Sequence, residues 1–201
     1  MALVDIVNEE QEVLESVWIE RAHDILGEDP ESRDELIEEL KELVESEENL
    51  VVPNEDKFYL MFLRGGMMSP KNSFAIMENY FRLRKDYPKY FRSSTELALM
   101  EQNVFSQKIH CVLPFRDQHG RRTYVVRPGL WDPDKVPFED VFCAEYMLSE
   151  LIIKEERTQI AGVVCIVDAS GFGFRQLRAM GIEDSINSSN FLNTASCLAS
   201  S

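Results

Sequence analysis

The stretch GVVCIVDASGFGF, residues 162–174, decides the fold of this chain. An apolar, mostly β-branched run is followed by Asp168 and then by Gly171 and Gly173. That order is typical either of a nucleotide-binding loop or of a buried strand that leaves its sheet through a tight turn. The choice between the two decides whether an enzyme is expected.

The spacing argues against a phosphate site. A dinucleotide-binding loop needs a third small residue three positions after its second glycine, and this chain has Gln176 there. No Gly-Lys-Ser/Thr follows, so the stretch is not a P-loop either. We therefore predict a strand over 162–168, with Asp168 capping or ordering the turn that follows.

Working outward, the flanking segments alternate in type. KIHCVLPF (108–115) and RTYVVRP (122–128) are short apolar runs joined by a turn containing Gly120, which predicts a hairpin. Residues 138–156 and roughly 174–193 have helical patterns, and the first of these is apolar on more than one face, as in a helix buried on two sides. Strand, helix, strand, helix predicts an α/β layer architecture.

The first ninety residues predict a small helical domain instead. Residues 9–26 are helical in pattern, Ser32 and Glu35 form a capping-box pattern, and a short helix begins near residue 56. The best-marked helix starts at Ser69 and Pro70 and stops before Pro88.

The composition disfavours some classes of partner and cellular location. The 201 residues are 44% hydrophobic and carry a net charge of −15, which disfavours nucleic acid as a partner. Much of the acid lies in residues 28–49, which we interpret as a solvated helix face. No run is long enough to span a membrane, and the acidic start does not resemble a signal peptide, so a cytoplasmic protein is expected.

The sequence contains no recognisable catalytic motif and no set of residues with metal-ligand spacing. The cysteines at 111, 143, 165 and 197 are too far apart for a CxxC motif and are expected to be reduced, with Cys111 and Cys165 in the core. His23, His110 and His119 fall in a helix, a strand and a turn without metal-ligand spacing. We expect neither a cofactor nor an enzyme.

Three segments together resemble the CRAL-TRIO lipid-transfer family, especially its tocopherol- and retinoid-binding members. FYLMFLRGGMMSPKNSFAIMENYFRLRKDYPKYF is similar to the family's N-terminal helical domain, and VLPFRDQHGRRTYVVRPGLWDP to the hairpin that opens its lipid domain. SELIIKEERTQIAGVVCIVDASGFGF resembles its long helix, T-Q-x-x-G, strand, Asp and Gly-aromatic series. The segments occur in family order over about residues 55–193.

The resemblance implies an α/β fold with a helical domain (1–90), an incomplete CRAL-TRIO lipid-binding domain (91–193) and an unstructured tail (194–201). In the family a mixed sheet floors an apolar pocket that helices wall and a mobile helix gates. The implied function is cytosolic binding of a small tocopherol- or retinoid-like lipid and its transfer between membranes, with transient contact at the membrane surface. The pocket residues implied by the resemblance are Phe142, Tyr146, Ser149, Val163, Val167, Met180, Phe191 and Leu192.

Alternatives remain for individual residues. Phe142, Val163 and Val167 fit ordinary core equally well. Ser149 could fix a ligand hydroxyl or bond back to its own helix. Glu145 is expected to face the same cavity, where it must turn outward, find a basic partner or contact a polar ligand end.

The similarity fades near residue 193, before the family's further strands, gate helix and phosphoinositide-binding basic residues. Phosphoinositide binding is therefore expected only of full-length family members. A shortened chain would leave the strand 162–168 unpaired at one edge, so we expect marginal stability and weak lipid binding, and a monomer if it folds stably. The alternative function is a non-transporting interaction or membrane-recruitment module, as in CRAL-TRIO domains of GTPase regulators.

Overall fold

The computed structural model describes residues 16–91, 104–181, 184 and 186. Its α-helices are α2 (Ser16–Leu26), α3 (Arg33–Glu45), α4 (Asp56–Gly65), α5 (Pro70–Asp86), α7 (Phe138–Ile153), α8 (Glu156–Ala161) and α9 (Phe174–Ala179). Its strands are β1 (His110–Arg116), β2 (Arg122–Val126) and β3 (Val163–Val167). Short 3-10 turns are η2 (Pro88–Tyr90), η3 (Phe105–Gln107) and η4 (Pro128–Leu130). The predicted mixed α/β architecture is confirmed.

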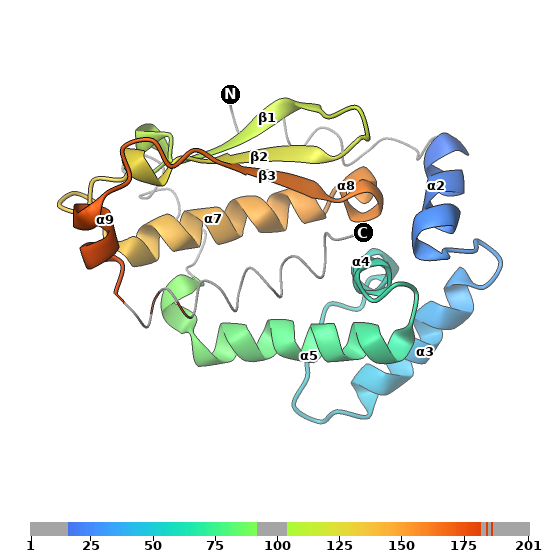
Figure 1. The fold of residues 1–201 in the computed structure, drawn as a ribbon. Coiled ribbons are helices and arrows are strands. Elements are labelled where there is room, and N and C mark those ends of the chain that lie inside the picture. Colours follow the sequence, from blue (N-terminus) through green and yellow to red (C-terminus); the bar gives the residue numbers. More distant parts are fainter. Residues whose placement is uncertain (1–15, 92–103, 182–183, 185, 187–201) are drawn as a thin grey trace.

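The elements form layers (Figure 1). The sheet lies along one side, α7 runs beneath it, and α3, α4 and α5 lie on the far side of α7. The short helix α8 sits at the end of the sheet, where α2 and α4 approach it. This arrangement makes α8 the meeting point of the helical part and the sheet.

The sheet has the order β1-β2-β3. β1 and β2 form the predicted antiparallel hairpin, whose register shifts between Val112 and Arg116. β2 and β3 are parallel, with Tyr124 opposite Cys165 and Val126 opposite Val167. A parallel pair needs a crossover, and α7 with α8 supplies it.

Local signals account for several boundaries. Ser69 has extended backbone and its Oγ accepts a hydrogen bond from the Asn72 amide at 3.5 Å, and Pro70 occupies the first turn of α5. The helix ends at Asp86, before Pro88, as predicted. Ser32 precedes α3 but makes no side-chain capping bond, because its backbone is already helical, with ψ of −7°.

The helix predicted over 138–156 ends early: α7 stops at Ile153, Glu155 is extended, and a separate helix, α8, begins at Glu156. In the segment predicted as helix from about residue 174, α9 ends at Ala179, and Gly181 follows in the left-handed region with φ of +65°. Beyond it the prediction is tested only at residues 184 and 186, which are both helical. Residues 9–15, the predicted tail 194–201 and most of 182–193 lie outside the described residues.

The largest apolar core joins the helical part to the sheet. Leu40 and Phe62 are fully buried in the same cluster as Tyr124 and Ile160. Burying a side chain such as Phe62 stabilises the fold by roughly 2–3 kcal/mol. The sheet and the helices are thus held by one continuous interior, and a smaller cluster around Trp131 packs near the start of α7.

Candidate functional site

The face of the sheet that looks toward α7 can be followed from the register. Arg122, Tyr124 and Val126 alternate on one face of β2, and Val163, Cys165 and Val167 lie opposite them on β3. The Arg122 guanidinium pairs with the Glu155 carboxylate just before α8, which places this face toward the helices. We call the β3 part of this face, residues 163, 165 and 167, the floor.

The floor becomes more open along β3. Val163 is half-buried against the main core, Cys165 is exposed, and Val167 is 63% exposed. β3 is therefore not the buried strand expected from its apolar sequence, and Cys165 is not a core residue. The reason is its place at the edge of the described sheet, where only β2 pairs with it. Cys111 is half-buried and Cys143 is buried, both free thiols as expected.

Gly171 and Gly173 follow β3 in a tight turn that Asp168 orders. Asp168 accepts a hydrogen bond from the Ser170 amide at 3.0 Å, which with the Ser170 hydroxyl lowers the pKa of this carboxyl. Gly171 adopts a left-handed backbone with φ of +79°. The turn also packs closely on Gly129, because a Cβ added to Gly129 would lie 2.0 Å from the Ser170 carbonyl oxygen. The predicted ordering role of Asp168 is confirmed.

Three of the proposed pocket residues lie on α7 in different surroundings. Phe142 is buried and meets the Tyr90 ring edge-on at 4.9 Å. The Tyr146 hydroxyl donates to Glu150 at 2.5 Å. Ser149 Oγ donates to the Glu145 carbonyl oxygen at 3.0 Å, so its hydroxyl bonds back to its own helix.

The remaining proposed residues are farther along the chain. Met180 is half-buried and packs on the small cluster around Trp131. Phe191 and Leu192 lie outside the described residues. The structure thus brings Val163 and Val167 together on the floor, while Phe142, Tyr146 and Met180 pack into other clusters.

Glu145 lies on α7 beneath β2 and β3. Its side chain is half-buried and makes no hydrogen bond or ion pair with the residues that the structure describes. Desolvation raises the pKa of this carboxyl to about 7. Its charge acts on Tyr124 and Cys165, since burial first and the Glu145 carboxylate second raise the pKa of both groups. Of the three alternatives, a basic partner is absent in this part of the chain.

A buried histidine fixes the sheet on α7 nearby. His110 Nδ1 lies 2.6 Å from the Tyr124 hydroxyl, and its Nε2 lies 3.1 Å from the Val141 carbonyl oxygen. Burial lowers the pKa of His110 to about 4, so the imidazole is neutral at physiological pH. It therefore bridges β1, β2 and α7 without adding a charge.

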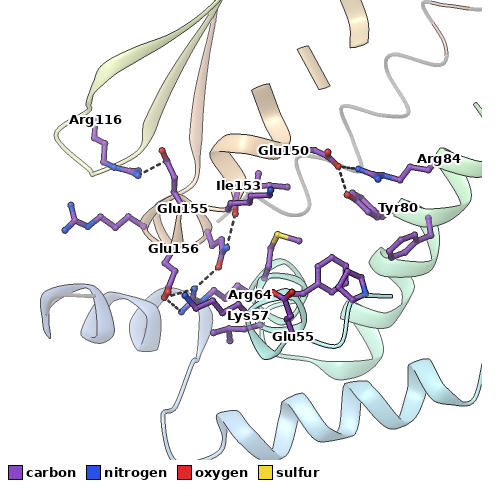
Figure 2. Close-up of a pocket in the computed structure, with 18 residues that line it drawn as sticks. Glu55, Lys57, Arg64, Tyr80, Arg84, Arg116, Glu150, Ile153, Glu155 and Glu156 are labelled. Carbon is purple, nitrogen blue, oxygen red and sulfur yellow. Dashed lines mark hydrogen bonds and ion pairs between the residues drawn. The ribbon is translucent and has the colours of Figure 1, made fainter. Parts of the chain in front are cut away.

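A cavity of about 580 Å³ lies between the helical part and the α7–α8 segment (Figure 2). Apolar side chains such as Phe58, Met61 and Phe81 line it from α4 and α5. Its opposite wall is charged, from Glu150 at the end of α7 to Glu156 on α8. Of the eight residues proposed from the sequence, the six that the structure describes do not line this cavity.

Hydrogen bonds and ion pairs link the charged wall of the cavity to its surroundings through Arg64, Glu155, Thr158 and Gln159, which together with the buried Glu28 we call the α8 junction. Arg64 pairs with Glu28 at 2.8 Å, both side chains being 1% exposed, and donates to Gln159 at 2.7 Å. Arg64 also pairs with Glu156 on α8 (Figure 2). Thr158 donates to Glu155 at 2.6 Å. The Thr-Gln pair of the sequence motif therefore holds helices to the sheet.

On the same side of the cavity, Glu150 joins α7 to α5. It accepts a hydrogen bond from the Tyr80 hydroxyl at 2.5 Å and pairs with Arg84 (Figure 2). It also accepts from the Tyr146 hydroxyl at 2.5 Å. Tyr80 and Arg84 were not predicted as partners of Glu150 because they lie 70 and 66 residues from it in the sequence. No local pattern identifies such a pairing.

Two further findings concern the described residues. No helix among them has both the length and the apolar character needed to cross a bilayer. Nor does this part of the chain gather three or more His, Cys, Asp or Glu side chains in an arrangement suited to a metal ion.

Comparison with known proteins gives a consistent result. Residues 106–198 match the CRAL/TRIO domain. The chain is similar to human alpha-tocopherol transfer protein-like, 29% identical over 164 residues, which is 81% of this chain and 47% of that protein. It is also 24% identical to clavesin-1 of Xenopus laevis over 159 residues, 79% of this chain and 48% of that protein. The chain spans about half the length of the relatives it matches.

Proposed function

We propose that this chain, whose residues 106–198 match the CRAL/TRIO domain, binds one small hydrophobic lipid, tocopherol- or retinoid-like, and exchanges it at membranes. Similarity to human alpha-tocopherol transfer protein-like, whose name refers to tocopherol transfer, supports this proposal. Binding, rather than a covalent reaction, is the function that we assign. The protein is accordingly not an enzyme in this proposal.

The observation that carries the proposal is the open floor. Exposed apolar side chains on an inward-looking sheet face are unusual unless a ligand or partner covers them. Val167 is 63% exposed although its neighbour across the register, Val126, is half-buried against the main core. A lipid tail lying along β3 would cover Val163, Cys165 and Val167 from the side of α7.

A second exposed apolar group fits contact with a membrane. Leu130 follows Gly129, whose backbone contacts the turn at residues 170–172. α9 begins two residues after this turn, at Phe174. Phe174 is 78% exposed and Leu177 is 55% exposed on α9. Arg178 adds a cation in the same helix, which anionic headgroups attract. We propose this end of the molecule as the surface that touches the donor or acceptor membrane.

One pair of variants tests the floor. Val167→Glu puts a charge on the floor, whereas Ile166→Glu puts the same charge on the opposite face of β3, where Ile166 is 47% exposed. Native mass spectrometry and retinol fluorescence should show one bound retinol per chain for the wild type and for Ile166→Glu. Val167→Glu should bind roughly tenfold more weakly or worse, because a lipid cannot solvate the new carboxylate. Equal binding by the two variants would place the ligand elsewhere.

A further inference from the structure

Glu145 differs from every other buried acid discussed above. Glu28, Glu150 and Glu155 each meet at least one arginine. The Glu145 side chain is half-buried, and its carboxylate makes neither an ion pair nor a hydrogen bond in the part of the chain that the structure describes. A carboxylate kept in such a place lowers the stability of the fold, since water is partly removed and nothing replaces it.

The groups that face Glu145 are neutral near pH 7. From β2 comes Tyr124, from β3 comes Cys165, and their phenol and thiol carry no charge at that pH. His110 on β1 is bonded to Tyr124 and to the Val141 carbonyl, and it too is neutral. On α7 itself, Ser149 one turn on donates its hydroxyl to a backbone carbonyl rather than to the Glu145 carboxylate. No described neighbour therefore neutralises this carboxylate.

Position gives the carboxylate access to the proposed ligand. Glu145 lies one turn before Leu148 on the same face of α7, and Leu148 packs in the same core cluster as Tyr124, whose register partner on β3 is Cys165, the exposed middle residue of the floor. In keeping with this placement, the Glu145 charge contributes to the raised pKa of Cys165. A lipid that covers the floor would thus bring one of its ends close to Glu145, in a setting with little water. There a hydrogen bond to a charged acceptor is worth more than in bulk solvent.

We propose that Glu145 selects ligands by their head group, favouring lipids that end in an amine or alcohol and disfavouring lipids that end in a carboxylate. This inference rests on the lipid-binding function proposed above. An ammonium or hydroxyl head donates to the Glu145 carboxylate and satisfies it. A carboxylate head meets a like charge that no nearby cation offsets.

The selection depends on pH in a defined direction. The pKa of Glu145 is raised to about 7, so the carboxyl is ionised well above that pH and protonated well below it. Acidification removes the like-charge repulsion before a fatty-acid head itself becomes protonated. Discrimination against carboxylate ligands should therefore weaken between about pH 8 and about pH 5.5.

Three ligands with one tail measure this selection. Decylamine, decanol and decanoate share a flexible apolar chain and differ in their heads, and isothermal titration with native mass spectrometry reports their binding. At about pH 8 the wild type should bind decylamine roughly tenfold to a hundredfold more tightly than decanoate, with decanol between them. In Glu145→Gln the three affinities should converge to within about threefold and lose their pH dependence, since the amide carries no charge.

The matched control is Glu139→Gln, which removes another carboxylate from the same helix, in its first turn. This variant should keep the order seen in the wild type. An unchanged order in Glu145→Gln, with binding retained, overturns the head-group role and leaves the lipid site intact. If no ligand binds to the wild type or to either folded variant at either pH, the proposed function fails and takes this inference with it.

Discussion

The α8 junction and the floor are neighbours along the chain, since β3 follows α8 directly, yet the charged side chains beside them have opposite surroundings. At the junction, Arg64 and Glu28 are both 1% exposed and fully engaged. Beneath the floor, Glu145 is half-buried with no partner in the described chain. The contrast separates two uses of a polar side chain. Those at the junction hold elements together, whereas the one beneath the floor is the side chain that we propose to meet the ligand.

The largest effect on the free energy of unfolding is expected for a substitution at the α8 junction. Arg64→Met leaves Glu28 buried with one fewer cation and Gln159 without its donor, which should lower the free energy of unfolding by about 3–5 kcal/mol. Urea denaturation followed by circular dichroism measures this change. Arg82→Met, at an exposed arginine of α5, should change it by no more than about 0.5 kcal/mol. Similar losses in the two variants would remove the distinction drawn between the regions.

A substitution beneath the floor is expected to change the free energy of unfolding in the opposite direction. Glu145→Gln should raise the free energy of unfolding at about pH 8 by up to roughly 3 kcal/mol, because the folded state no longer holds a poorly solvated charge. Partial exposure of Glu145 will reduce that figure. The measurement is the same urea titration, run on the ligand-free protein. A loss of stability would mean that the carboxylate has a structural partner after all.

The pH profile sharpens the comparison further. The pKa of Glu145 is raised to about 7, so its contribution to stability falls as pH rises from its ordinary value toward 7. The pKa of His110 is lowered to about 4, so its contribution falls as pH drops from the ordinary histidine value toward 4. The two slopes oppose each other between about pH 4.5 and pH 6.5.

Thermal unfolding across that window should therefore show a shallower pH dependence in the wild type than in Glu145→Gln. The variant should become steadily less stable on acidification, since only the His110 slope remains. Parallel profiles for the two proteins would show that the Glu145 carboxyl titrates in its ordinary range.

The smallest effect on stability is expected at α9. Phe174 is 78% exposed, so Phe174→Ser should change the free energy of unfolding by no more than about 0.5 kcal/mol. Its effect should be on membranes instead. Co-sedimentation with phosphatidylcholine–phosphatidylserine vesicles should fall several-fold relative to the wild type, while Val17→Ser, at another exposed apolar residue, should bind as the wild type does.

Local sequence signals predicted those parts of the fold that depend on neighbours along the chain. Ser69, Pro70 and Pro88 bound α5, and Gly120 lies in the hairpin turn between β1 and β2. Contacts between side chains far apart in the sequence could not be predicted. Nothing near Arg64 in the sequence indicates Glu28 or Gln159, because ion pairs across a fold leave no local periodicity.

The site was predicted unevenly for a similar reason. An apolar run shows that β3 is a strand, but whether its face is covered depends on what lies beside it in the sheet. The exposure of Cys165 and Val167 therefore could not be read from their types. Glu145 could be recognised as an anomaly on an apolar helix, but the absence of a described partner appears only when β2 and β3 are in place.

The order of strand pairing has a consequence for folding. β1 and β2 are joined by a short turn, so their hairpin can form early from contacts close in sequence. β3 can join β2 only after α7 and α8 have brought the chain back across the sheet. The floor is thus the last part of the sheet to assemble. In hydrogen exchange, the amides of β3 should lose protection before those of the hairpin, so the surface proposed to hold the lipid is also the first to loosen.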